Sequence, residues 1–196
     1  MKLTVMACAL YVSLMCSSAA QECATLQHAN PATLVSYLDN IQPNEQNADC
    51  ITVAIKKLTA ERSESAIPAL TKLLDFRRPL TESEKGGFFR RPMIREELYP
   101  AAGALEEIGK KALPAVLDVI KASSSAIARE NGVVVWMEVY KDDAATGVAL
   151  LRQEAAGAID LTAKDNLMLA LQKAPTFCGP KDMKRCKAAA VLPKSQ

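Results

Sequence analysis

Residues 101–120 read AAGALEEIGKKALPAVLDVI, and this stretch decides the fold class. Its apolar residues recur at the three- and four-residue spacing of an amphipathic helix on both sides of Gly109. Glycine tolerates the left-handed backbone that ends a helix, so we expect one helix over about 93–108 and a second over about 111–122. Because short connections favour antiparallel neighbours, the stretch is predicted to be a helical hairpin.

The same apolar pattern occurs once more, 46 residues earlier in the chain. The segment IPALTKLL at residues 67–74 corresponds to LPAVLDVI at residues 113–120. Such a recurrence is typical of stacked helical repeats, in which neighbouring hairpins share a continuous core. The predicted helices pair as 49–60 with 65–76, 93–108 with 111–122, and 125–140 with 143–157, and a last helix at 163–173 closes the stack.

Signals for β-structure are nearly absent. The β-branched run Gly132-Val133-Val134-Val135-Trp136 could form a strand, but no second segment could pair with it, so we predict a helix there with Trp136 in the core. Near the start, Asn30-Pro31 supplies an N-cap and a proline at the first helical position, which predicts a short helix ending near Gln42-Pro43. The sequence therefore predicts an all-α chain.

The central hairpin resembles a HEAT repeat of the bacterial HEAT-like type. The resemblance rests on Arg95, Ala101-Ala102, Ala104-Leu105, Ile108-Gly109, Ala112-Leu113-Pro114-Ala115 and Val119-Ile120. It is good over residues 94–121, weaker over 51–75, and holds only in outline over 125–157. The family's arginine usually lies one turn before the paired alanines, whereas Glu96 to Pro100 intervene here, so Pro100 is expected to kink the helix or to start it afresh.

The resemblance implies an all-α, HEAT-like α-solenoid of about three stacked helical hairpins with capping helices. Such solenoids have a concave surface, and the family's usual work is protein binding. A fold alone does not give a function.

The first twenty residues have the three parts of a secretory signal. Lys2 is the charged start, residues 3–15 are apolar, and Ser18-Ala19-Ala20 is a small-residue cleavage site, so the mature, secreted or periplasmic chain is expected to begin at Gln21. An acylated Cys16 is the rival reading, which the bulky residue before it disfavours. No later segment has 18 uncharged apolar residues in a row, so no transmembrane segment is predicted in the mature chain.

Removing the signal leaves Cys23, Cys50, Cys178 and Cys186, an even number in a chain marked for an oxidising compartment. Four cysteines allow three pairings. We favour Cys23 with Cys50 and Cys178 with Cys186, because each pair lies near one chain end and closes a short loop. Neither pair has two-residue ligand spacing and His28 is the only histidine, so no metal site is predicted.

These features divide the chain into a signal peptide (1–20), an N-terminal capping helix region (21–48), a HEAT-like helical repeat domain (49–175) and a C-terminal tail with a disulfide loop (176–196). The tail carries Lys181, Lys184, Arg185 and Lys187 and is predicted to be solvated and cross-linked. Without Lys2 the chain has 23 Lys and Arg against 22 Asp and Glu, a near-neutral balance that gives no sign of nucleic-acid binding.

No catalytic constellation is evident. With His28 alone, no compact Ser-His or Cys-His pair is available, and Gly86-Gly87 lacks the spacing of a nucleotide loop, so neither an enzyme nor a cofactor is predicted. Glu106 and Glu107 each precede a lysine by four residues, which predicts exposed ion pairs on a solvated helix face.

Residues 77–92, RRPLTESEKGGFFRRP, form the longest predicted connection. Compact domains rarely carry more than about 12 to 15 residues without secondary structure unless the loop is functional or disordered. Phenylalanine and arginine together suit an interface. The predicted partner-binding residues are Phe88, Phe89, Arg90, Arg91, Arg77 and Arg78. The alternative, in which both phenylalanines fold back on the helices while the arginines face water, stays open.

The sequence thus predicts an exported binding module for a protein or peptide. One alternative is a lyase or hydrolase whose acid–base residues are Glu, Tyr or Lys, with Glu96, Tyr99 and Glu138 as candidates in a deep pocket. The other alternative is a structural envelope protein that self-associates.

Overall fold

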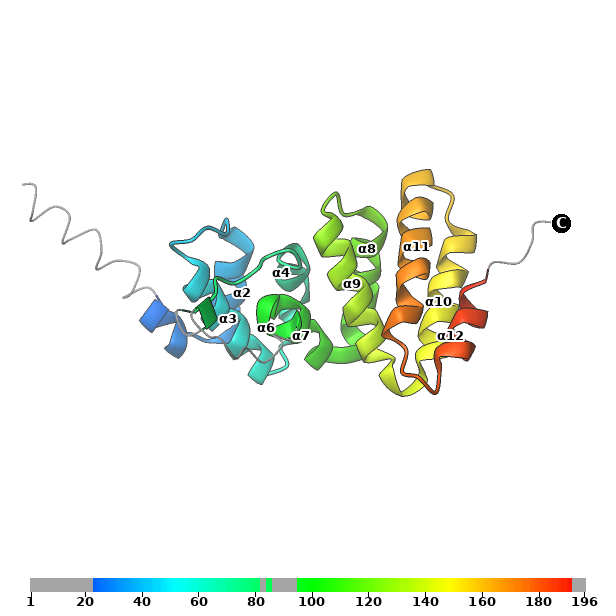
Figure 1. The fold of residues 1–196 in the computed structure, drawn as a ribbon. Helices are drawn as coiled ribbons and strands as arrows, with labels where there is room; N and C mark the ends of the chain where they lie inside the picture. The colour runs from blue at the N-terminus through cyan, green and yellow to red at the C-terminus, as the bar shows by residue number, and fades with distance from the viewer. Residues whose placement is uncertain (1–22, 82–83, 86–94, 192–196) are drawn as a thin grey trace, which may run out of the picture.

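The computed structural model describes residues 23–81, 84–85 and 95–191. Within these ranges the chain is helical and contains no β-strand, which confirms the all-α class (Figure 1). The helices are α2 (Pro31–Asn40), α3 (Ala48–Ala60), α4 (Ile67–Lys72), α6 (Arg95–Leu98), α7 (Pro100–Ile108), α8 (Leu113–Ala122), α9 (Ala126–Val139), α10 (Ala144–Gly157), α11 (Leu161–Lys173) and α12 (Met183–Ala190). Four 3-10 turns join them: η1 (Glu64–Ala66), η2 (Gly109–Ala112), η3 (Lys141–Asp143) and η4 (Ala174–Phe177).

Helix boundaries follow the expected local signals. The Asn30 side chain accepts a hydrogen bond from the Thr33 backbone N–H at 2.9 Å and caps α2. Pro100 begins α7 and separates it from α6, so the predicted helix over 93–108 is interrupted where proline cannot donate the helical hydrogen bond. Gly109 has φ +77° and ends α7.

The helices form two rows along the molecule (Figure 1). In one row α3, α7 and α9 pack side by side, and in the other α2, α4, α8 and α11 do. The core lies between the rows. Its largest fully buried side chains include Leu34, Leu38, Ile51, Ile55, Leu58, Leu70, Leu74, Leu105, Ile120, Leu151 and Leu167. Each such burial stabilises the fold by about 1.5 to 3 kcal/mol before chain entropy is counted.

The C-terminal pairing differs from the predicted hairpin of residues 125–140 with 143–157. α10 packs mainly against α11 and α12, and it is α11 that lies beside α8. The reason lies in α9, whose residues 131–137 are all buried. Apart from Asn131 this segment is apolar on every side, and such a segment must be enclosed; α7, α8, α11 and η4 surround it. The segment with β-propensity is therefore a helix, as predicted, with Trp136 in the core.

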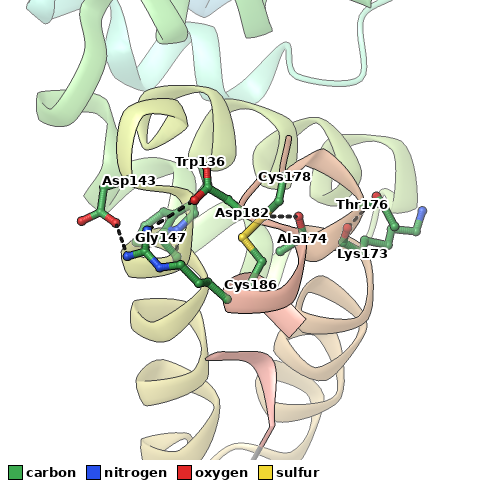
Figure 2. Close-up of a disulfide and its surroundings, with 10 residues drawn as sticks. Trp136, Asp143, Gly147, Lys173, Ala174, Thr176, Cys178, Asp182 and Cys186 are labelled. Atoms are coloured by element: carbon green, nitrogen blue, oxygen red, sulfur yellow. Dashed lines mark hydrogen bonds and ion pairs between the residues drawn. A yellow bond between two sulfur atoms is a disulfide. The ribbon is translucent and has the colours of Figure 1, made fainter. Parts of the chain in front are cut away.

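Both favoured disulfide pairings are present. Cys23 is bonded to Cys50 with a Cα–Cα distance of 4.7 Å, and Cys178 to Cys186 with a distance of 6.6 Å. Figure 2 shows the second bond close to Trp136, whose Nε1 donates a hydrogen bond to the Gly147 carbonyl at 2.9 Å. Two disulfides are typical of proteins from oxidising compartments. No helix in the described ranges has both the length and the apolarity needed to span a bilayer.

The C-terminal segment is not the solvated tail that the sequence predicts. Its residues 183–190 form α12, which packs against α10, and Cys186 has no exposed surface. The basic side chains of the segment are exposed, as predicted, whereas Cys186 is buried and Ala189 and Ala190 are half-buried. The disulfide therefore lies in the core rather than in a loose tail.

Candidate functional site

A groove of about 820 Å³ runs over the junction of α3 and α7. One face of α3 lines it through residues at helical spacing, among them Asp49, Val53 and Lys56. α6, α7 and the segment after α4 complete the walls. We call this feature the α3/α7 groove. Its carboxylates are Asp49, Glu84, Glu96, Glu97, Glu106 and Glu107, and its basic lining residues among those described are Lys56 and Arg78.

Arg78 stabilises the groove wall that is formed by the segment after α4. Its guanidinium forms a two-pronged ion pair with Glu84, with N–O distances of 2.8 and 2.6 Å, and also donates to the backbone carbonyls of Pro79 and Glu97. The hydrogen bonds from Arg78 are the main reason that the pKa of Glu84 is lowered to about 2. Arg78 thus ties the segment after α4 to α6.

The predicted partner-binding residues that the structure describes lie in different surroundings. Arg78 is half-buried and engaged in the wall, whereas Arg77 is exposed and lines an adjoining hollow with Glu45 and Lys85. Residues 88–91, which contain the predicted Phe88, Phe89, Arg90 and Arg91, lie outside the described residues. A binding role for all six stays a prediction.

Glu106 is the most unusual group in the groove. Its Oε1 is enclosed and has no hydrogen-bond partner among the described residues. Burial is the largest cause that raises its pKa to about 8, and the negative charges of Glu96 and Glu138 raise it further, while Lys141 acts in the opposite direction. This carboxyl group is therefore mostly protonated at neutral pH, when most surface carboxylates are ionised.

The prediction of exposed ion pairs from Glu106 and Glu107 to lysines four residues later is wrong. α7 ends at Ile108, and the positive φ of Gly109 turns the chain before either lysine is reached. Glu107 instead pairs with Arg62 at 3.1 Å, and Lys111 pairs with Glu64. Without its expected partner, Glu106 lies on the side of α7 that faces the groove.

Two neighbouring helices bring carboxylates towards Glu106. α6 crosses α7 closely at Gly103, where an added methyl group would lie 3.2 Å from Cβ of Glu96. α9 also packs against α7 and carries Glu138 one residue before its end at Val139, where Glu138 pairs with Lys141 at 3.0 Å. Glu96 and Glu138 also line a second, smaller hollow of about 310 Å³ beside the exposed ring of Phe177. Arg95 and Lys141 line this hollow too, so its charges are balanced.

Glu96 and Glu138, two of the three candidate acid–base residues, thus lie near Glu106, whereas the third, Tyr99, has a different neighbour. Tyr99 lies under the guanidinium of Arg95, 5.4 Å from its ring centroid. Arg95 itself donates to the buried Asn131, which in turn donates to the carbonyl of Leu74. Tyr99 is therefore part of a structural network that ties α6 to α9 and to the end of α4.

Sequence reasoning missed Glu106 as a site residue. One signal was present: Ala101, Ala102, Ala104 and Leu105 form the buried stripe of α7, and Glu106 follows that stripe directly and lies one turn after Ala102. Glu138 was named as a candidate acid–base residue, but its approach to Glu106 had no sequence signal, because it depends on how α9 packs against α7.

Comparison of the chain with protein-family models, with curated proteins and with solved structures finds no significant match in any of the three. The chemistry of the groove must therefore be argued from its own residues. No group of three or more metal-ligating side chains occurs among the residues described. The arrangement is suited to binding a positively charged group, or to exchanging a proton near neutral pH.

Proposed function

We propose that the protein is an exported, HEAT-like helical-repeat binding module that holds a protein or peptide partner in the α3/α7 groove. The observation that carries the proposal is the groove itself, about 820 Å³ in volume, open, and formed by two neighbouring helices of one row. Successive helical hairpins present extended surfaces of this kind more readily than closed cavities. Export is supported by the signal-like first twenty residues and by the two disulfides.

The test is affinity capture with residues 21–196 as bait, from the extracytoplasmic fraction of the cells that make the protein. Val53 lies half-buried in the groove wall, so Val53→Trp is designed to fill the groove. Leu169→Trp is the matched control, because Leu169 is exposed on α11 in the opposite row. A partner lost with Val53→Trp but retained with Leu169→Trp supports the proposal. A partner that both variants retain, or no specific partner, refutes it.

One observation favours a second candidate, an acid–base enzyme of the lyase or hydrolase type. A carboxyl group with a pKa of about 8 is suited to general acid or base catalysis at neutral pH. Intact mass measurement of the captured partner separates the two functions. A partner that leaves the groove chemically unchanged excludes the enzyme, whereas a mass change that Glu106→Gln abolishes would replace the binding module by an enzyme.

A further inference from the structure

The α3/α7 groove concentrates negative charge on a chain that is otherwise nearly balanced. Six carboxylates and two basic residues line it, an excess of four negative charges when all are ionised, whereas the formal charge of the whole chain is +2. Glu84 is compensated by Arg78 and Glu107 by Arg62, and Glu97 also interacts with other residues, which leaves Asp49, Glu96 and Glu106 beside the single lysine Lys56. The electrostatic field of the remaining carboxylates favours a positively charged occupant of the groove and disfavours anions.

The groove also has an apolar floor. Val53 is its partly exposed side chain, and Ile55, Pro100 and Ala104 lie beneath with little or no exposed surface. The aliphatic stem of lysine or arginine packs well on such a side chain while its charged end reaches a carboxylate. A small hydrated cation would leave Val53 uncovered.

Glu106 supplies the position where that charged end would bind. Its side chain is half-buried and lines the groove, while its Oε1 is enclosed and has no hydrogen-bond partner in the described part of the chain, so the rest of the carboxyl group is what a ligand in the groove would meet. The charged groups that influence it are Glu96 from α6, Glu107 from α7, Glu138 from α9 and Lys141 from η3. Acidic groups outnumber the one lysine, so a cation bound against this carboxyl group from the groove would relieve the mutual repulsion of the carboxylates.

We infer that the groove's partner presents a basic segment, and that one arginine or lysine side chain of it lies on the apolar floor with its charged group against Glu106. This inference rests on the proposed binding function and specifies its partner class. A cation beside Glu106 favours the ionised carboxylate, so binding at neutral pH releases a proton from this residue. Proton release is a readout that general surface attraction would not produce.

The experiment uses residues 21–196 with both disulfides formed and a fluorescein-labelled octapeptide of alternating arginine and glycine. Matched octapeptides carry glutamine or glutamate in place of arginine. Fluorescence anisotropy at pH 7 and near-physiological salt is expected to detect binding of the arginine peptide and of neither other peptide. Removing a charge-assisted hydrogen bond costs roughly tenfold to a hundredfold in affinity, so Glu106→Gln is expected to weaken binding by at least about tenfold.

Asp118→Asn is the matched control, because Asp118 is exposed on α8 in the opposite row and the change removes the same charge. It is expected to leave affinity within about twofold, since exposed charges far from the site are screened. Calorimetry in two buffers of different ionisation enthalpy is expected to show proton release with the wild type and none with Glu106→Gln. Circular dichroism of each variant verifies that it is folded.

Three results overturn the inference: no binding of the arginine peptide, equal binding of the glutamine peptide, or an affinity that Glu106→Gln leaves unchanged. Failure of the inference is distinct from failure of the proposed function. A partner captured in a Val53-dependent manner would keep the groove as a binding site even when the arginine peptide does not bind, and would show that the partner is recognised by other chemistry.

Discussion

Replacing Glu106 by glutamine is expected to stabilise the protein, and to do so increasingly as the pH rises. Glutamine has nearly the shape of the protonated carboxyl group but cannot ionise. Below pH 4.5 the carboxyl group of Glu106 is neutral in both the folded and the unfolded chain, so its ionisation contributes nothing to the difference between variant and wild type. Between pH 4.5 and 8 the unfolded chain ionises while the folded protein does not, and the wild type loses stability throughout this window.

The magnitude follows from the two pKa values, 4.5 for the ordinary group and about 8 in the folded protein. Since each pKa unit corresponds to about 1.4 kcal/mol, the variant is expected to gain about 3 kcal/mol in free energy of unfolding at pH 7 and about 5 kcal/mol above pH 8. These values are upper bounds, because water that enters the groove on ionisation lowers the cost of the buried charge.

The assay is urea-induced unfolding followed by far-ultraviolet circular dichroism at pH 4.5, 7 and 8.5, for the wild type, Glu106→Gln and the control Asp118→Asn. All other titrating groups cancel in the difference between variant and wild type when the dependence on urea is unchanged. A stability difference that is the same at every pH would refute the reasoning, because it would mean that Glu106 is already ionised and solvated in the folded protein.

Two further predictions concern the scaffold. Asn131→Ala removes a buried amide that links Arg95 to the carbonyl of Leu74. In chemical denaturation the variant is expected to lose about 2 to 4 kcal/mol in free energy of unfolding. A loss below about 1 kcal/mol would show that water replaces the amide. Replacing Cys178 and Cys186 together by alanine opens a loop with a sequence separation of 8 and is expected to cost about 2 to 3 kcal/mol through chain entropy; an unchanged melting temperature on calorimetry would contradict this expectation.

Much of the helix pattern could be predicted because its signals are local. The cap at Asn30, the proline at position 100 and the glycine at position 109 each act on the backbone within a few residues, and each has the expected effect in the structure. The favoured disulfide pairs could be predicted for the same reason, since each cysteine pair closes a short loop near one chain end.

The features that sequence reasoning missed depend on distant parts of the chain. α12 is short and strongly basic, and it is held in place by a disulfide and by packing against α10. The burial of Glu106 requires α6 to cross at Gly103 and α9 to deliver Glu138 from 32 positions further along. Helical periodicity says which side of a helix faces inward, but not which neighbour covers it.

The positions of the two disulfides also affect where local unfolding begins. An array in which each helix contacts mainly its neighbours ordinarily frays from its two ends, because terminal helices have only one neighbour each. Here Cys23–Cys50 ties the first described residues to α3, and Cys178–Cys186 ties α12 to the chain that follows η4, so both ends are cross-linked. Amide hydrogen exchange is therefore expected to slow at the ends, and the easiest local opening moves inward from them.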